Sequence, residues 1–389
     1  MKPSLEGKNV LIGITGGIAA YKIPELVRLL QKHGASVSTI LTENGKRFVS
    51  EYTLNILTHG RCFSHGFGEG IPHIDLARWA DIIAILPASY NTIGKIASGI
   101  ADNLLTTTLA ASNVPVVIFP TMNTTMYENP IHQRNLEYLK EIGYRVVPPV
   151  EGILACGEEG PGRMPEPEEI VLYIQQGLGD HAFSGMRVVI TMGGTEEPID
   201  PVRVVSNRSS GRMGLEIAKA FFLRDGDVSI LHGRTSVPIP KVFKTIKTID
   251  TKTMEEALQK NLVDAHVLVM AAAESDFVPI YSKKKIKRNG SRIDLHLKPN
   301  KDLLVSITKR WKNGVVVGFT LDEDDVLLET AYKKMEKKHC DIMIANTLDT
   351  IGGENTRGYI ITDKGEEWFE TTKEELAWMI TEKVKQLKS

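Results

Sequence analysis

The sequence predicts an α/β fold built from two Rossmann-like domains. Short β-branched runs alternate with longer helix-compatible stretches, which is typical of βαβ units around a parallel sheet. The alternation occurs in two series, separated by residues 148–167, which are rich in Pro and Gly and show no periodicity. A chain of 389 residues also exceeds the roughly 250–300 residues that one hydrophobic core usually serves. We therefore expect two domains.

The first series predicts strands at residues 9–14, 37–41, 82–86, 116–119 and 145–147. The second predicts strands at residues 187–191, 227–231, 266–271, 315–319, 341–345 and 359–362. We place the first domain at residues 1–180 and the second at residues 185–389. The stretch between the series, residues 148–167, is predicted to be a long functional loop or a linker.

Composition excludes several classes of protein. No apolar run approaches the roughly 20 residues that span a bilayer, so we expect a cytoplasmic chain without membrane contact. A net charge of −1 argues against nucleic acid as the main partner. The three cysteines, Cys62, Cys156 and Cys340, form no CxxC pair, so neither a disulfide framework nor a zinc site is indicated.

A Gly-Gly turn, Gly16-Gly17, follows the first predicted strand and precedes apolar residues at helical spacing, Ile23, Leu26 and Leu30. Glycines at this point allow backbone N–H groups to approach an anion at a helix N-terminus. The spacing is neither GxGxxG nor a Walker motif, so a plain strand-to-helix turn remains an equal alternative.

Polar residues follow other predicted strands of the first series. Ser89 and Asn91 come where strand ends deliver ligand-binding groups, or where a helix is capped. Asn123 is placed to recognise a carboxylate or amide, or to make an Asx turn. His73, near an Asp, is either a catalytic group or an ordinary polar residue. The residues alone indicate an anion-binding α/β domain.

The segment "ACGEEGPGRM", residues 155–164, places Cys156 among glycines and charges that cannot bury it. Together with "TGGIAAYK", "HIDLARWAD", "LPASYNTIGKIASGIADNLL" and "PTMNTTMY", it resembles the flavin-dependent decarboxylases that act on 4′-phosphopantothenoylcysteine. "GTEEPIDPVRVVSNRSSGRMG", "AAAESDF", "KPNKDLL" and "AYKKMEKKHCDIMIAN" resemble phosphopantothenate–cysteine ligases. The chain is thereby identified as a member of the fused ligase–decarboxylase family of coenzyme A biosynthesis.

The resemblance implies a flavodoxin-like decarboxylase domain that uses FMN as its electron acceptor. Cys156 would donate the proton in the final reduction, from a glycine-rich flap that closes over the substrate. His73 would be the active-site base or orienting group, and Asn123 would bind the departing carboxylate. The FMN site would include Gly16, Gly17, Ser89 and Asn91.

For the second half the resemblance implies a nucleotide-binding domain that activates 4′-phosphopantothenate with CTP as an acyl-cytidylate, which cysteine then attacks. Mg²⁺ would assist, with unknown protein ligands. Asn207 would hold the intermediate, and Lys285, within the basic run of residues 283–288, would hold the triphosphate. Taken alone, such a run is usually a solvated loop or a nucleic-acid patch. The remaining nucleotide-binding residues would be Asp276, Asp302, Phe319, Lys334 and Lys338.

The resemblance also implies homo-oligomers, with trimeric decarboxylase contacts and dimeric ligase contacts that together give a dodecamer. Some residues depart from the family pattern. Thr121 and Tyr127 replace alanine and tryptophan, Arg212 and Arg288 replace lysines, and "AAAESDF", with its added Glu274, stands where AAVAD or AAVSD is usual. Two alternatives therefore stay open, a ligase half with altered nucleotide specificity and a non-catalytic flavin-binding regulator. The lack of GxGxxG disfavours a dehydrogenase.

Overall fold

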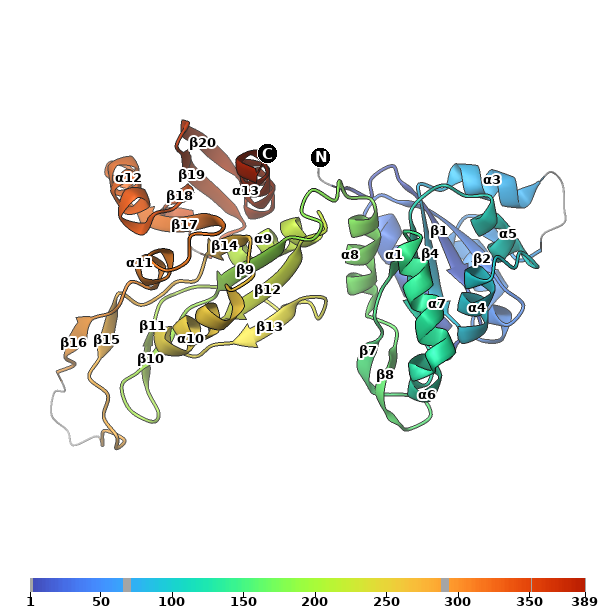
Figure 1. Cartoon of the computed structure of the whole chain (residues 1–389), viewed down its shortest axis with the longest axis horizontal. Coiled ribbons are helices and arrows are strands. Elements are labelled where there is room, and N and C mark those ends of the chain that lie inside the picture. Colours follow the sequence, from blue (N-terminus) through green and yellow to red (C-terminus); the bar gives the residue numbers. More distant parts are fainter. Residues whose placement is uncertain (1–2, 66–70, 288–293, 351, 389) are drawn as a thin grey trace. The chain divides into compact units, whose positions relative to one another are not determined.

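The structure is a computed structural model that describes residues 3–65, 71–287, 294–350 and 352–388. The chain divides into two compact units, Met1–Asp180 and His181–Ser389. Each unit is a sheet with helices on both faces (Figure 1), which confirms the predicted α/β class. None of the described helices is long and apolar enough to cross a bilayer.

The first unit contains a parallel sheet in the order β3-β2-β1-β4-β5-β6. Its strands are β1 (Asn9–Ile14), β2 (Ser36–Leu41), β3 (Cys62–Phe63), β4 (Ile82–Ala88), β5 (Val116–Pro120) and β6 (Arg145–Val146). This is the Rossmann order, and without the two-residue edge strand β3 it becomes the flavodoxin-like order. The predicted strands differ from the observed ones only at their ends, apart from β3, which was not predicted.

The helices of the first unit are η1 (Ile18–Lys22), α1 (Ile23–Lys32), η2 (Gly45–Arg47), α2 (Glu51–Leu57), α3 (Pro72–Trp79), α4 (Tyr90–Ala97), α5 (Leu104–Ala110), α6 (Thr124–Glu128), α7 (Pro130–Glu141) and α8 (Pro167–Gly177). Helices α1 and α8 pack on one face of the sheet, where Ile23, Leu26 and Leu30 are fully buried, as their spacing predicts. Helices α3, α4, α5 and α7 pack on the other face.

The prediction of a loop or linker at residues 148–167 is wrong. This stretch forms an antiparallel hairpin, β7 (Val150–Ile153) and β8 (Glu159–Arg163), and the chain then enters α8, which is still part of the first unit (Figure 1). The hairpin strands bury almost no side chains, so they lack the alternation of apolar and polar residues by which a strand is recognised in a sequence.

The second unit is built on an eight-stranded sheet in the order β13-β12-β9-β14-β17-β18-β19-β20. Its strands are β9 (Arg187–Met192), β12 (Asp227–His232), β13 (Lys244–Lys247), β14 (Val267–Met270), β17 (Val315–Asp322), β18 (Ile342–Thr347), β19 (Asn355–Thr362) and β20 (Gly365–Thr372). Strands β19 and β20 run antiparallel, so the parallel arrangement expected for residues 359–362 is wrong. Residues 359–362 belong to β19, which joins β20 through a tight hairpin, and an antiparallel hairpin needs no crossover helix.

Two short antiparallel pairs extend from this unit: β10 (Glu196–Pro198) with β11 (Val204–Ser206), and β15 (Phe277–Pro279) with β16 (Leu297–Pro299). The helices are α9 (Arg212–Phe222), α10 (Thr251–Asn261), α11 (Leu303–Thr308), α12 (Leu327–Lys338), η3 (Leu348–Thr350) and α13 (Lys373–Lys388). Helices α10, α11 and α12 contribute to the core on one face of the sheet. Helices α9 and α13 pack against each other and contact the sheet.

A threonine hydroxyl joins the two strands at which the order of the first sheet reverses. Thr15, which is 1% exposed, donates through Oγ1 to the carbonyl of Pro87 (2.5 Å) and accepts from the N–H of Ser89 (2.9 Å). The carboxyl ends of β1 and β4 are therefore held at a fixed separation. In open α/β sheets this reversal point is where ligands bind.

We predict that Thr15→Val lowers the free energy of unfolding of the first unit by about 0.5–1.5 kcal/mol, because it leaves the part-buried N–H of Ser89 without its protein acceptor. Urea unfolding of the full chain, followed by circular dichroism, measures the loss. Hydrogen exchange at the Ser89 amide identifies its origin, since Thr15→Ser keeps the hydroxyl and should keep that amide protected. Equal exchange rates in the two variants would contradict this explanation.

Candidate functional site

The first pocket, of about 660 Å³, lies at the carboxyl ends of β1, β4 and β5. Its walls come from residues 16–19 and 21–22, from Ser89 and Tyr90, from residues 121–123, and from residues 153–156 and 162–164 of the β7–β8 hairpin. Five of the site residues predicted for the first unit line this pocket: Gly16, Gly17, Ser89, Asn123 and Cys156.

Ser89 caps the N-terminus of α4, since its Oγ accepts from the N–H of Thr92 at 3.4 Å. Beside it, Gly17 leads into η1, and a Cβ at Gly17 would lie 3.2 Å from the Pro87 ring. The capping and ligand-binding interpretations of Ser89 are thus compatible, because Ser89 caps a helix that begins at the wall of the pocket.

The side chains of Cys156 and Asn123 are in contact at the wall of the pocket, although 33 positions separate the two residues in sequence. The Asn123 side-chain nitrogen lies 3.7 Å from the Cys156 sulfur and donates a hydrogen bond to the Glu158 carboxylate. The Asn123 side-chain oxygen accepts from the N–H of Met126 at 3.2 Å, so Asn123 also caps α6. An amide donor and an exposed thiol therefore face the same space.

The hairpin is docked on the Asn123 segment by contacts that only glycine permits. The N–H of Met122 donates to the carbonyl of Gly162 (3.2 Å), and a Cβ at Gly162 would lie 2.1 Å from the Met122 oxygen. A Cβ at Gly160 would lie 2.6 Å from Thr124 Oγ1, which itself donates to the carbonyl of Pro161. The glycines around Cys156 thus bring β8 against the backbone beside Asn123.

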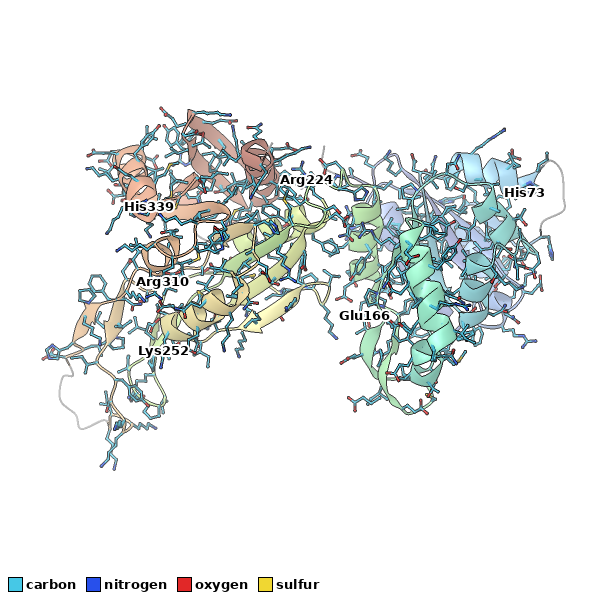
Figure 2. All side chains as sticks on the ribbon, in the orientation of Figure 1. His73, Glu166, Arg224, Lys252, Arg310 and His339 are labelled. Carbon is cyan, nitrogen blue, oxygen red and sulfur yellow. The ribbon has the colours of Figure 1, made fainter. Side chains whose placement is uncertain are left out.

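Two predicted residues do not reach this pocket. Asn91 is exposed on α4 and is not part of the pocket lining. His73 lies at the start of α3, on a different side of the unit from the β7–β8 hairpin (Figure 2), and is likewise absent from the lining. Within one chain, then, the structure does not bring these two residues together with Cys156 and Asn123.

Two residues near the first site, Lys22 and Glu158, were not predicted from the sequence as site residues. Lys22, with 15% of its side chain exposed, lines the pocket and pairs with Glu166 at 2.7 Å. Both residues lie within the quoted motifs "TGGIAAYK" and "ACGEEGPGRM", and their charge was the available signal. The site therefore also holds a cation beside the Gly-Gly turn and a carboxylate beside the thiol.

The other two cysteines are chemically unlike Cys156. Burial raises the pKa of the half-buried Cys62 thiol, and it raises the pKa of the buried Cys340 thiol to about 12. Cys156 is exposed.

The second pocket, of about 590 Å³, lies at the carboxyl ends of β14, β17 and β18. It is lined by most of the residues predicted for the second unit, namely Asn207, Asp276, Asp302, Phe319, Lys334 and Lys338. Lys338 pairs with Asp302 (3.2 Å), and Lys334 donates to Thr320 Oγ1 (2.8 Å). The side-chain nitrogen of Asn207 donates to the carbonyl of Glu274 (2.7 Å).

A backbone cradle in this pocket is formed by residues 207–214, which lead into α9. Gly211, at the N-cap, has φ +79°, and a Cβ there would lie 2.7 Å from Thr235 Oγ1. A Cβ at Gly214 would lie 2.5 Å from that of Met192, so the helix can approach β9 only because this residue is glycine. The N-terminus of an eleven-residue helix thus points its N–H groups toward the pocket.

The Gly-Gly turn of the second unit is followed by different elements from those that follow the turn of the first. Gly193-Gly194 is followed by the β10–β11 pair, and α9 begins only at Arg212. The similarity between the two openings is therefore limited to the strand and its turn.

Lys285 is exposed and does not line the pocket. Its segment is anchored beside it, since the N–H of Ile286 donates to the Asp200 carboxylate at 3.0 Å. Although burial opposes ionisation, the N–H groups of Ile286, Val202 and Arg203 hold the pKa of Asp200 at about 2. Arg288, the last cation of the basic run, lies outside the described residues.

Burial raises the pKa of the Glu274 carboxyl to about 8. The attraction of Lys338 opposes this shift, and the negative charge of Asp302 adds to it. Burial lowers the pKa of Lys373, and the nearby charge of Arg212 lowers it further. Both Glu274 and Lys373 line the pocket.

Comparison with known proteins gives matches for both units. Residues 2–179 match the family described as Flavoprotein, and residues 183–387 match the DNA/pantothenate metabolism flavoprotein C-terminal domain. The coenzyme A biosynthesis bifunctional protein CoaBC of Bacillus subtilis (strain 168) is 38% identical over 358 residues, which cover 90% of this chain and 88% of the relative. The CoaBC protein of Escherichia coli (strain K12) is 33% identical over 353 residues, 88% and 87% of the two chains.

Solved structures resemble the separate units. The C-terminal domain of a CoaBC protein covers 54% of this chain and 98% of its own, with 26% identity and a TM-score of 0.46. A PPC decarboxylase mutant complexed with pantothenoylaminoethenethiol covers 43% and 96%, with 33% identity and a TM-score of 0.40.

We predict that Gly162→Ala separates the hairpin from the Asn123 segment, because the new Cβ cannot share space with the Met122 oxygen. Hydrogen exchange should show loss of protection at the Met122 amide and faster exchange across residues 150–163. Gly157→Asn is the matched control, since its positive φ suits asparagine and no atom lies within 4 Å of the added Cβ. Unchanged protection at the Met122 amide in Gly162→Ala would show that the hairpin docks without a glycine at position 162.

Proposed function

This chain belongs to the family of bifunctional coenzyme A biosynthesis proteins. From this premise we propose which of the two activities of the family each pocket carries out. The activities of the family are ligation of 4′-phosphopantothenate with cysteine and decarboxylation of the resulting 4′-phosphopantothenoylcysteine. We assign decarboxylation to the first unit and ligation to the second. The observation that supports the first assignment is the meeting of Cys156 and Asn123 in one pocket.

FMN is the cofactor of the first unit, and the residues of the pocket fit it. The fit rests on the Gly16-Gly17 turn, the hydroxyl of Ser89 and the Lys22 ammonium, which suit a phosphate, and on the apolar side chains of Ile18 and Met122, which suit a flat ring. When bound, FMN supplies the electron acceptor without which a carboxylate on a saturated carbon does not leave.

We assign the steps around the substrate to the residues of the hairpin and of the segment it covers. The Asn123 amide, now bonded to the Glu158 carboxylate, presents a donor that suits the departing carboxylate of the substrate. The thiol of Cys156, which lines the same pocket, would give a proton to the substrate carbon in the final reduction. With substrate bound, the hairpin would close over it and exclude water from that step.

His73 and Asn91 lie outside this pocket, and we propose that His73 serves the pocket of a neighbouring copy. Such a role accords with the trimeric contacts that the sequence resemblance implies. The same resemblance implies dimeric contacts for the second unit.

For the second unit we propose that CTP activates 4′-phosphopantothenate as an acyl-cytidylate, with Mg²⁺ on the phosphates. The α9 N-terminus and Gly211 support binding of an anion, and Phe319, Lys334 and Lys338 form a side of the pocket suited to the base and ribose. Asn207 would hold the intermediate, and Lys285 would move in from its exposed segment to contact the triphosphate. Glu274 favours a second candidate, a ligase with another nucleoside triphosphate.

We predict that Cys156→Ser still releases carbon dioxide but forms 4′-phosphopantetheine at least about 100-fold more slowly, because the hydroxyl is a far weaker acid than the thiol. The enethiol intermediate should accumulate and be detected by mass spectrometry. Cys62→Ser, which changes a thiol outside the pocket, should behave as wild type. Normal output of 4′-phosphopantetheine from Cys156→Ser would disprove the assignment.

We predict that Lys285→Gln slows ligation about 10- to 100-fold, since it removes one charge-assisted contact to the triphosphate. Decarboxylation by the same preparation should be unchanged. Pyrophosphate release with each of the four nucleoside triphosphates measures the first effect and identifies the preferred base. The exposed Lys252 (Figure 2) provides the control Lys252→Gln, and equal rates in the two variants would exclude the role of Lys285.

A further inference from the structure

Glu274 is a carboxyl group in the lining of the second pocket, just after the carboxyl end of β14. The main chain of Glu274 is held in place, since its carbonyl accepts from the Asn207 side chain at 2.7 Å. The backbone of Leu303, at the start of α11, acts on its carboxyl. Glu274 therefore lines the same pocket as the Asn207 segment and the residues at the start of α11.

The charges around this carboxyl do not balance a negative charge on it. Asp302, from the N-cap of α11, and Asp276, two positions along the chain, are both acidic. Lys338, from α12, is the cation that acts on Glu274, and it is already paired with Asp302 at 3.2 Å. An ionised Glu274 would thus compete with Asp302 for a single lysine and would also be repelled by Asp276.

Most of the other lysine and arginine side chains that line the pocket form an ion pair or a hydrogen bond with a group other than Glu274. Lys301 pairs with Glu255, and Arg212 pairs with Glu354. Lys334 donates to Thr320, and Lys373 donates to backbone carbonyls. Arg208 completes the set of cations that face the pocket.

The three carboxyl groups do not form a preformed metal site by themselves. Among the residues that the structure describes, no group of three or more His, Cys, Asp or Glu side chains is arranged to hold an ion. A neutral carboxylic acid, by contrast, offers an O–H donor as well as an acceptor. Nucleotides present acceptors, both on the phosphates and on the base, so a neutral acid suits this pocket and an ionised one repels its ligand.

We propose, building on the proposed ligase function, that Glu274 is a nucleotide-positioning residue that must carry a proton when the nucleotide binds. Binding of the triphosphate is then coupled to one proton. The pKa of about 8 sets the range of this coupling. The proton is present below pH 8, and the affinity it supports is lost as the pH rises through that value.

The test is calorimetric titration of the full chain with CTP and Mg²⁺ at pH 7, 8 and 9, in buffers with different ionisation enthalpies. The affinity of the wild type should fall about tenfold between pH 7 and pH 9, and the uptake should approach one proton at pH 9. The phosphates of CTP are already ionised in this range, because their last pKa lies near 6. Glu274→Gln keeps an uncharged donor and should bind CTP with the same affinity at each pH, without proton uptake.

The control Glu256→Gln changes an exposed carboxyl on α10, outside the pocket, and should keep the wild-type pH profile. The inference is overturned if the wild type takes up no proton, a result that needs no variant. It is also overturned if Glu274→Gln weakens binding equally at every pH but leaves the slope unchanged. Absence of CTP binding at all three values would instead refute the proposed use of CTP, and the inference with it.

Discussion

The architecture of both units depends on a hydroxyl that ties the two central strands together where the strand order reverses. In the first unit Thr15 bonds to the backbone after β4, and in the second Thr191 accepts from the N–H of Ala272 at 3.2 Å, just after β14. Thr195, in the following turn, accepts from Ser275 at 3.2 Å. Because all three threonines are buried, these bonds are shielded from water. They fix the opening between strands in which each pocket lies.

The two units use this opening differently. In the first, the chain enters η1 directly after the turn, and the ligand-facing groups are completed by a hairpin that lies after the last strand of the sheet. In the second, β10 and β11 intervene, so the helix that faces the pocket begins at Arg212. The same strand-and-turn opening thus supports a site closed by a glycine-rich hairpin in one unit and a site formed by a helix N-terminus and lysines in the other.

Periodicity predicted the central strands well because β1, β4, β9 and β14 are buried and rich in β-branched residues. It failed at β7 and β8, which have almost no buried face and are docked on residues 122–124 by close contacts of Gly160 and Gly162. Motif resemblance selected Cys156, Asn123 and Asn207, all of which line pockets. It did not predict that His73 would lie apart from them, since sequence order carries no information about which chain completes a site. The burial of Glu274 beside Asp302 and Lys338 likewise becomes visible only when α11 and α12 are in place.

The contrast among the three thiols has a consequence for the chain under oxidative or electrophilic stress. The thiolate is the reactive form of cysteine, and burial suppresses it at Cys62 and Cys340, whereas Cys156 is open to solvent. Small electrophiles and peroxides would therefore attack the chain first at the one thiol that lies opposite Asn123. The second pocket, which has no cysteine in its lining, would be spared direct attack. On the proposed role of Cys156, chemical damage would then leave ligation and release of carbon dioxide intact and block only the final reduction.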